Sequence, residues 1–199
     1  MSQQKYSLAF NTRAALIIDT ITIAKIYSEI GIWNNVKEFV SEQNILQART
    51  VSTANRIYSE ISHRLKLLTD KEMAFLLTGT EQEQRQIIWL AICKRYLLIK
   101  DFSIEVLTHR YDSSQYAVSQ DDYIYFYNGK AQWHENLDKA SAPSQRKARQ
   151  MVFIMLRECR LINETGEIMS QLLSDELLQT LKTSSPEYIR IFPGALGHG

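Results

Sequence analysis

The chain has 199 residues, of which 45% are hydrophobic and 23% charged, and its formal net charge is +1. This much apolar material excludes a disordered chain, and the scarcity of Gly (seven) and Pro (three) favours helices over a sheet. The first residues lack the apolar core and cleavage site of a signal peptide. The most apolar run, residues 14–32, contains Asp19, Lys25 and Glu29, whereas a membrane span needs about 20 nearly uncharged residues. We therefore expect a soluble, cytoplasmic protein that does not associate with a membrane.

Residues 1–79 are predicted to form an N-terminal helical lobe that contains a first helix-turn-helix-like element. A long first helix, capped by Asn11 or Thr12, ends at Gly31. The helices that follow are predicted over 35–43, over 53–68 and from Thr69 to just before Gly79. A short helix, a turn and an amphipathic basic helix are the outline of a helix-turn-helix unit.

The third predicted helix carries candidate DNA contacts. Thr53 and Asn55 stand in its first turn, and an Asn side chain can read adenine through two hydrogen bonds. Arg56 and Arg64 are expected on its exposed face, in a stretch whose local charge balance is +3. Glu60 lies four residues after Arg56, where the two side chains can pair. For this helix alone, a solvated surface is slightly favoured over nucleic-acid contact.

Residues 80–199 are predicted to form a C-terminal helical lobe, packed with the first as one globular unit. Thr80 and Glu83 make a capping box for a helix that runs to Ile99. Further helices are predicted over 101–111, 121–134, 143–162 and 175–181. The aromatic segment 121–134 also suits a strand with a type I′ turn. We predict a helix there because no partner strand is evident.

The segment 143–162 is predicted to be a basic helix of the recognition type, which enters the major groove of DNA. At 3.6 residues per turn it has one apolar face that can rest on a core. Another face carries a stripe of four arginines: Arg146, Arg149, Arg157 and Arg160. Ser141 or Ser144 can cap the start of this helix, where backbone N–H groups also favour phosphate, and Pro143 suits its first turn.

Charge is unevenly distributed along the chain. Residues 139–160 have a local balance of +5, whereas residues 101–138 have −5. The turn at 163–166 follows the basic helix where a winged helix-turn-helix domain has its hairpin. These features give equal weight to DNA contact and to a merely solvated basic face. The candidate DNA contacts are Thr53, Asn55, Arg56, Arg64, Ser144, Arg146, Lys147, Arg149 and Arg160.

The sequence shows no catalytic or metal-binding pattern. The four His residues are scattered, and there is no nucleophile elbow, P-loop or glycine-rich dinucleotide turn. Cys93 and Cys159 lack a CxxC partner and are predicted to be buried free thiols. The aromatic residues between 111 and 133 lie in the acidic region, which favours core packing over stacking on bases. We expect no enzymatic activity, no cofactor and no metal.

Three segments resemble sequences of the BrxA family, whose members are accessory proteins of BREX bacteriophage-exclusion systems. They are NTRAALIIDTITIAKIY, RTVSTANRIYSEISHRLKLLT and, most specifically, SAPSQRKARQMVFIMLRECRLI before a Gly turn. The resemblance implies an all-α, compact helical bundle with two helix-turn-helix-like elements, and the turn at 163–166 leaves room for a small wing after the second. It also implies a fold comparable with that of the RNA-binding protein NusB. Some family members have been labelled inner membrane proteins, and the charges within residues 14–32 argue against that label.

The same resemblance implies a function and partners. It implies a non-enzymatic protein that binds double-stranded DNA and works with other BREX components, namely a methyltransferase, an ATPase and a phosphatase-like protein. The family supplies no contact residues, so the candidate contacts come from the charge pattern alone. Two alternatives stay open: a NusB-like RNA binder, and a protein-interaction scaffold without nucleic-acid contact. We expect the chain to be monomeric on its own.

Overall fold

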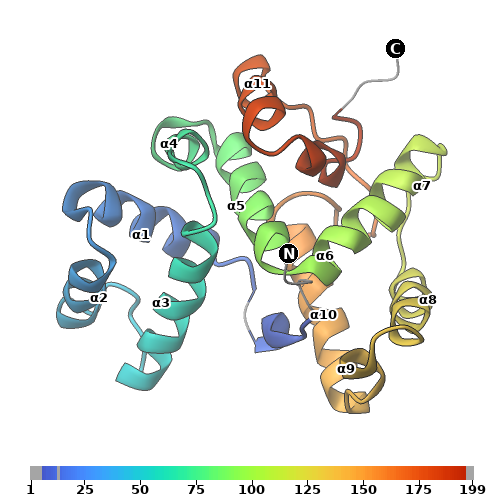
Figure 1. Ribbon diagram of the computed structural model, residues 1–199, viewed down its shortest axis with the longest axis horizontal. Coiled ribbons are helices and arrows are strands. Elements are labelled where there is room, and N and C mark those ends of the chain that lie inside the picture. Colours follow the sequence, from blue (N-terminus) through green and yellow to red (C-terminus); the bar gives the residue numbers. More distant parts are fainter. Residues whose placement is uncertain (1–5, 13, 196–199) are drawn as a thin grey trace.

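The computed structural model describes residues 6–12 and 14–195, which form an all-α fold (Figure 1). The α-helices are α1 (Ile17–Ile30), α2 (Trp33–Glu42), α3 (Val51–Leu65), α4 (Asp70–Thr78), α5 (Glu81–Arg95), α6 (Leu97–Phe102), α7 (His109–Asp112), α8 (Gln120–Ala131), α9 (Glu135–Asp138), α10 (Ala142–Glu158) and α11 (Asp175–Ser184). Three short turns of other helical types are η1 (Ala9–Thr12), η2 (Ser103–Thr108) and η3 (Pro186–Ile191). Within these residues no β-strand forms, so the predicted fold class is confirmed.

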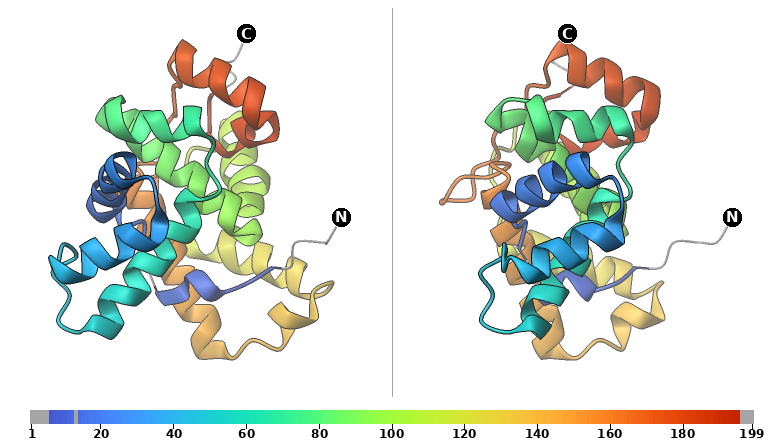
Figure 2. Two further views of the ribbon diagram at one scale, coloured as in Figure 1. Left: turned by 60° about the vertical axis from the view of Figure 1, so that its left-hand side comes forward. Right: turned by 90° about the vertical axis from the view of Figure 1, so that its left-hand side faces the viewer.

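Helices α1, α2 and α3 pack together as a three-helix unit on one side of the molecule (Figures 1 and 2). Gly31 ends α1 as expected, in the left-handed conformation with φ of 73°. The predicted start of this helix is wrong, because Leu16 also adopts a left-handed conformation and α1 begins only at Ile17. The residues before Leu16 include the separate turn η1. The side chains of Asn11 and Thr12, the predicted caps, lie outside the described residues.

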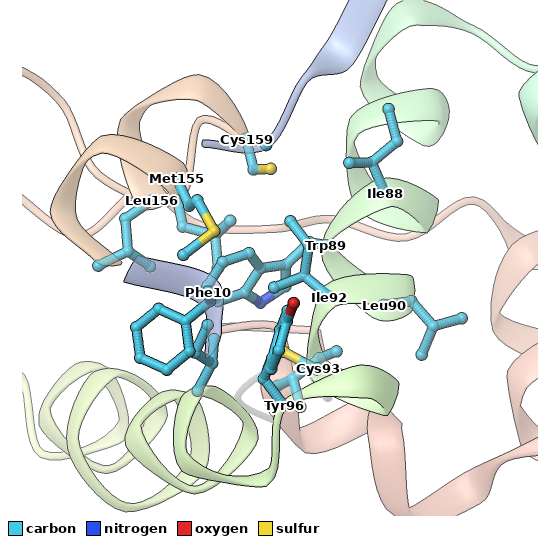
Figure 3. Close-up of a cluster of buried hydrophobic side chains, with 14 of the residues drawn as sticks. Phe10, Ile88, Trp89, Leu90, Ile92, Cys93, Tyr96, Met155, Leu156 and Cys159 are labelled. Carbon is cyan, nitrogen blue, oxygen red and sulfur yellow. The ribbon is translucent and has the colours of Figure 1, made fainter. Parts of the chain in front are cut away.

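Helix α5 runs through the centre of the fold and is buried along most of its length. Trp89 of α5 is fully buried and lies among side chains from η1 and from the end of α10 (Figure 3). Cys93 and Cys159 belong to this cluster and are buried free thiols, as predicted (Figure 3). The hydrophobic core therefore joins the two ends of the chain to its middle.

Capping boxes fix the starts of three helices. They are Thr69 with Glu72 for α4, Thr80 with Glu83 for α5, and Ser119 with Asp122 for α8. The ambiguous aromatic segment is helical, as predicted, because α8 spans most of it. Helix α5 does not reach Ile99, since Tyr96 is extended with φ of −124° and the chain restarts as α6.

The N-terminal segment is tied to the end of α10. The backbone N–H of Ala15 donates to Glu158 Oε2 at 2.7 Å, although 143 residues separate the two in sequence. The Arg85 guanidinium of α5 donates to the backbone carbonyl of Glu158. The end of α10 is thereby held from two sides, whereas its start lies at the edge of the fold (Figure 1).

The turn after α10 lies where the sequence predicts it, but it is not a two-stranded wing. Asn163 Oδ1 accepts hydrogen bonds from the backbone N–H groups of Thr165 and Glu167, which closes the turn. Only isolated bridges flank it in the described chain, from Ile162 to Ile168 and from Ala117 to Glu167. Glu164 and Glu167 make this turn acidic, in contrast to the cationic wings that contact phosphate.

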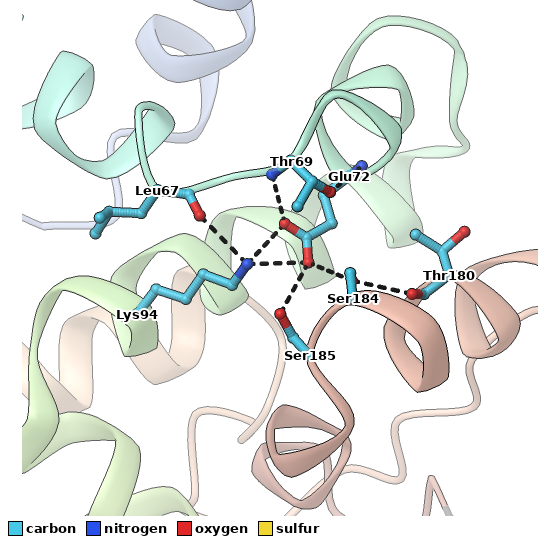
Figure 4. Close-up of polar contacts among 7 residues, drawn as sticks. All are labelled: Leu67, Thr69, Glu72, Lys94, Thr180, Ser184 and Ser185. Atoms are coloured by element: carbon cyan, nitrogen blue, oxygen red, sulfur yellow. Dashed lines mark hydrogen bonds and ion pairs between the residues drawn. The ribbon is translucent and has the colours of Figure 1, made fainter.

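A buried carboxylate connects α4, α5 and α11 (Figure 4). Glu72 is fully buried and pairs with Lys94 Nζ at 2.7 Å. It also accepts hydrogen bonds from the Thr69 backbone N–H and from the hydroxyl groups of Ser184 and Ser185. Burial acts to raise the pKa of Glu72, but the hydrogen bonds from Lys94, Thr69 and Ser184 outweigh it and hold that pKa below its usual value.

Replacing Glu72 with Gln should therefore destabilise the protein by about 3 kcal/mol at pH 7, because it exchanges the buried carboxylate that pairs with Lys94 for a neutral amide. A lowered folded pKa gives stability that is present above the unfolded pKa of about 4.3 and lost as pH falls through the folded pKa. The gap between parent and variant in urea unfolding should shrink on acidification. Glu42→Gln, at an exposed position of α2, is the control and should stay within about 0.5 kcal/mol.

Candidate nucleic-acid interface

The start of α10 presents free cations. Ser141 caps the helix by accepting from the Ser144 N–H, and the Ser141 hydroxyl also donates to that of Ser144 at 3.0 Å. Ser144, a candidate contact, is therefore partly occupied by the cap. Arg146 and Lys147 are exposed and Arg149 is half-buried. Within the described residues none of these three cations has a carboxylate partner.

The far end of the predicted arginine stripe is different. Helix α10 ends at Glu158, so Arg160 lies beyond it in a left-handed conformation with φ of 58°. Arg160 pairs with Glu81 at 2.7 Å, and Arg157 lies 3.8 Å from Glu164. The prediction of a continuous four-arginine stripe is therefore wrong. Among the residues that the structure describes, only its first half, Arg146 and Arg149, forms no ion pair.

Helix α3 offers a second basic surface, headed by Arg56. The N-cap is Thr50, one turn earlier than predicted, and it accepts from the Thr53 N–H. The Thr53 side chain is exposed and its hydroxyl accepts from that of Thr50. Arg56 is exposed and does not pair with Glu60, whose carboxylate instead accepts hydrogen bonds from Arg64 and Tyr96. This removes the counter-charge that the sequence spacing gives to Arg56.

Asn55 does not face outward with Arg56. It is half-buried and lines a groove of about 500 Å³ between α2 and the start of α3. Lys37 and Glu38 of α2 line the same groove, so the charge next to Asn55 is mixed. Asn55 therefore lies beside charged residues of α2 rather than next to free cations alone.

Arg64 is buried, so the prediction that it is exposed is wrong. Its side chain is 1% exposed, and its Nε donates to Glu60 Oε1 at 2.7 Å. Its Nη1 donates to the carbonyl oxygens of Ala14 and Ala15 at 3.1 Å each. The guanidinium satisfies backbone groups that precede α1, where no helix ladder is available. Arg64 therefore stabilises the folded N-terminal segment and is not part of the candidate interface.

The exposed side of α3 includes a residue that the list of candidate contacts lacks. His63 is exposed, and its Nδ1 lies 3.4 Å from the Ser59 hydroxyl. It follows Arg56 by seven residues, which is two helical turns and places both on one face. That spacing is the sequence signal for His63. Lys66, one turn further on, lies over the Trp33 ring at 5.4 Å and is held there.

The two basic helix starts lie at the same edge of the molecule. In Figure 1 and in both views of Figure 2, which turn about the vertical axis, α3 and α10 begin near the lower edge and run upward. Each N-terminus adds a partial positive charge to the cations beside it. Some of the acidic residues between them in sequence are paired: Asp122 with Arg110, Asp101 and Glu105 with Lys130, and Glu135 with Lys139. The edge is therefore suited to an extended anion.

The aromatic residues divide into two groups. Tyr123, Phe126 and Tyr127 are buried, as core packing predicts. Tyr125 is 87% exposed and Trp133 is 83% exposed, which core packing does not predict.

No group of three or more potential metal ligands occurs among the described side chains. None of the helices in this part of the chain is long and apolar enough to cross a membrane.

Comparison with known proteins identifies the family. The family model for BrxA matches residues 4–185. The chain belongs to the BrxA family. A protein from Bacillus cereus (strain H3081.97), named BREX protein BrxA, is 24% identical to this chain over 189 residues, covering 92% of each. A second BREX protein BrxA, from Escherichia coli O9:H4 (strain HS), is 32% identical over 71 residues, which are 36% of this chain and 33% of that protein.

A solved structure shows the same fold. The crystal structure of an uncharacterized protein from Magnetospirillum magneticum superposes with a TM-score of 0.82 and 18% identity, covering 95% of this chain and 99% of that one. At this identity the likeness concerns the arrangement of helices and not a function. The helical arrangement of this BrxA family member thus recurs in a chain of distant sequence.

Proposed function

We propose that this BrxA family member is a non-enzymatic accessory protein of a BREX phage-defence system and that it binds double-stranded DNA in the cytoplasm. The observation that carries the proposal is the start of α10, where Arg146, Lys147 and Arg149 have no counter-charge among the described residues. Guanidinium and ammonium groups beside a helix N-terminus favour phosphate. Family membership supports the assignment to BREX.

In the proposed complex the duplex lies along the edge that α3 and α10 share (Figure 2). Arg146, Lys147 and Arg149 contact one stretch of backbone phosphates, and Arg56 and His63 contact another. The pairing of Arg157 with Glu164 and of Arg160 with Glu81 leaves the far end of α10 near neutral. The DNA is therefore held at the starts of the helices rather than along them.

The exposed aromatic pair supports contacts with other proteins. Tyr125 and Trp133 lie on and just after α8, and aromatic residues are enriched in protein interfaces. A scaffold role within a BREX complex, toward its methyltransferase, ATPase or phosphatase-like protein, fits this surface. Such a role accompanies DNA binding in our proposal and does not replace it.

The test is the salt dependence of binding to a labelled 20-base-pair duplex, with single-stranded DNA and hairpin RNA as competitors. Each phosphate contact should add about −0.9 to the slope of log K against log salt. We expect Arg56→Gln with His63→Gln to flatten the slope by about 1 to 2. The control pair is Lys25→Gln with Lys182→Gln, which removes two cations from exposed positions of α1 and α11.

An unchanged slope in the α3 variant would restrict the interface to α10. Affinity that barely responds to salt would contradict phosphate contact and favour the scaffold alone. Hairpin RNA that competes better than duplex DNA would favour the NusB-like alternative.

A further inference from the structure

A small cavity lies between α8 and the first turns of α10, directly behind the proposed DNA contacts. Its volume is about 180 Å³. Ile124 and Tyr127 of α8 and Ala142 of α10 give it apolar walls, and the side chains of Arg146 and Arg149 complete its lining. The cavity therefore combines apolar walls with two cationic groups that lack counter-charges among the described residues.

Tyr123 lines this cavity and holds an unused hydrogen-bond donor. The residue is 2% exposed, and its hydroxyl has no hydrogen-bond partner within the described part of the chain. Burial raises the pKa of this hydroxyl above its usual value, and the nearby Arg149 opposes the shift only in part. Tyr123 therefore stays protonated at neutral pH and needs an acceptor.

Two other polar side chains of the lining are already engaged. Tyr127 donates its hydroxyl hydrogen to the carbonyl of Leu137, and Gln145 donates to the carbonyl of Ala140. The cap on Ser144 and the missing N–H of Pro143 also leave few backbone donors at this helix start. The donors left for a ligand are the Tyr123 hydroxyl, the Asn128 amide and the two guanidinium groups.

We propose that this cavity binds the terminal phosphate of a nucleotide, with the adjoining part of the sugar against the apolar walls. A volume of 180 Å³ corresponds to about six water molecules, which suits a phosphate group and a few further atoms. A terminal phosphate presents three free oxygens to these donors. An internal phosphodiester has only two free oxygens, and the chain continues on both sides of it.

A terminal nucleoside phosphate can come from a free nucleotide or from the 5′ end of a DNA strand. The inference extends the proposed function, because Arg146 and Arg149 would serve both the duplex backbone and the cavity. Duplex binding and binding of a terminal phosphate in the cavity can be tested separately, since a DNA dumbbell with closed ends has a duplex backbone but no terminal phosphate.

The experiment measures binding of thymidine 5′-monophosphate and thymidine by calorimetry, and of 5′-phosphorylated, unphosphorylated and dumbbell duplexes by anisotropy. We expect binding of the monophosphate but not of thymidine, and a preference for the phosphorylated duplex. Tyr123→Phe should weaken binding of the monophosphate about ten-fold, which is the effect expected from losing a hydrogen bond to a charged group. It should not lower the melting temperature, because the hydroxyl has no internal partner to lose. Tyr125→Phe, on the exposed side of the same helix, is the matched control.

Three outcomes would overturn the cavity assignment: equal affinity for monophosphate and thymidine, no effect of Tyr123→Phe, or a fall in melting temperature with that variant. Dumbbell binding without monophosphate binding would leave the DNA proposal standing alone. Monophosphate binding that depends on Tyr123, without dumbbell binding, would support the cavity with a free nucleotide as its ligand and contradict the duplex proposal.

Discussion

Replacing Arg64 with Ala should destabilise the protein by about 4 kcal/mol, within the range expected when one partner of a buried ion pair is removed. The substitution leaves Glu60 without its cation and leaves the carbonyl oxygens of Ala14 and Ala15 without a donor. The side chain is 1% exposed, so solvent cannot replace these contacts. Urea unfolding at pH 7 measures the loss.

Arg56→Ala is the control for this prediction, since it removes the same side chain from an exposed position of the same helix. Its stability should stay within about 0.5 kcal/mol of the parent. Arg64→Lys should not restore the parent stability, because one ammonium group cannot reproduce the forked contacts of a guanidinium. Equal losses for Arg56→Ala and Arg64→Ala would contradict the buried role of Arg64.

Charge reversal at the start of α10, Arg146→Glu with Arg149→Glu, should weaken duplex DNA binding about a thousand-fold near 0.1 M salt. Loss of two phosphate contacts accounts for about a hundred-fold of this, and repulsion of the backbone by the new carboxylates for the rest. The melting temperature should change little, because neither arginine forms an ion pair with a described residue. Fluorescence anisotropy and thermal unfolding measure the two quantities.

The matched control carries the same change in charge at a distance from the interface. Lys25→Glu with Lys182→Glu reverses the charge of two exposed residues on α1 and α11. It should weaken duplex DNA binding at most about ten-fold, through the change in the electrostatic field of the whole protein. If the folded α10 variant binds duplex DNA as the parent does, the start of α10 is a solvated surface and the proposed function is wrong.

The sequence predicts helix starts well where a capping pattern is local. Thr80 with Glu83 spans four residues, and the box it predicts is present at the start of α5. The break between α5 and α6 at Tyr96 has no such local signal, because neither Gly nor Pro stands there. The helix is interrupted by the packing of α6. A local signal is also absent at the end of α10, where Arg160 adopts the left-handed conformation usually taken by Gly.

The candidate site shows where charge patterns mislead. Counting Arg64 as a surface cation overlooks its place three residues after Ile61 and four before Leu68, on the apolar side of its helix. A long side chain on that side can still be buried if backbone carbonyls need donors, as those of Ala14 and Ala15 do. Such tertiary acceptors cannot be deduced from local spacing.

The hydrogen bond between Ala15 and Glu158 also bears on how the protein is made. Contacts between residues so far apart in sequence close late, since the loop between them must be ordered first. During synthesis the three-helix unit α1 to α3 can collapse early, but its N-terminal segment cannot dock until α10 has left the ribosome. We expect an intermediate in which Phe10 and Trp89 are still exposed, and chaperones are suited to protect that surface until the chain is complete.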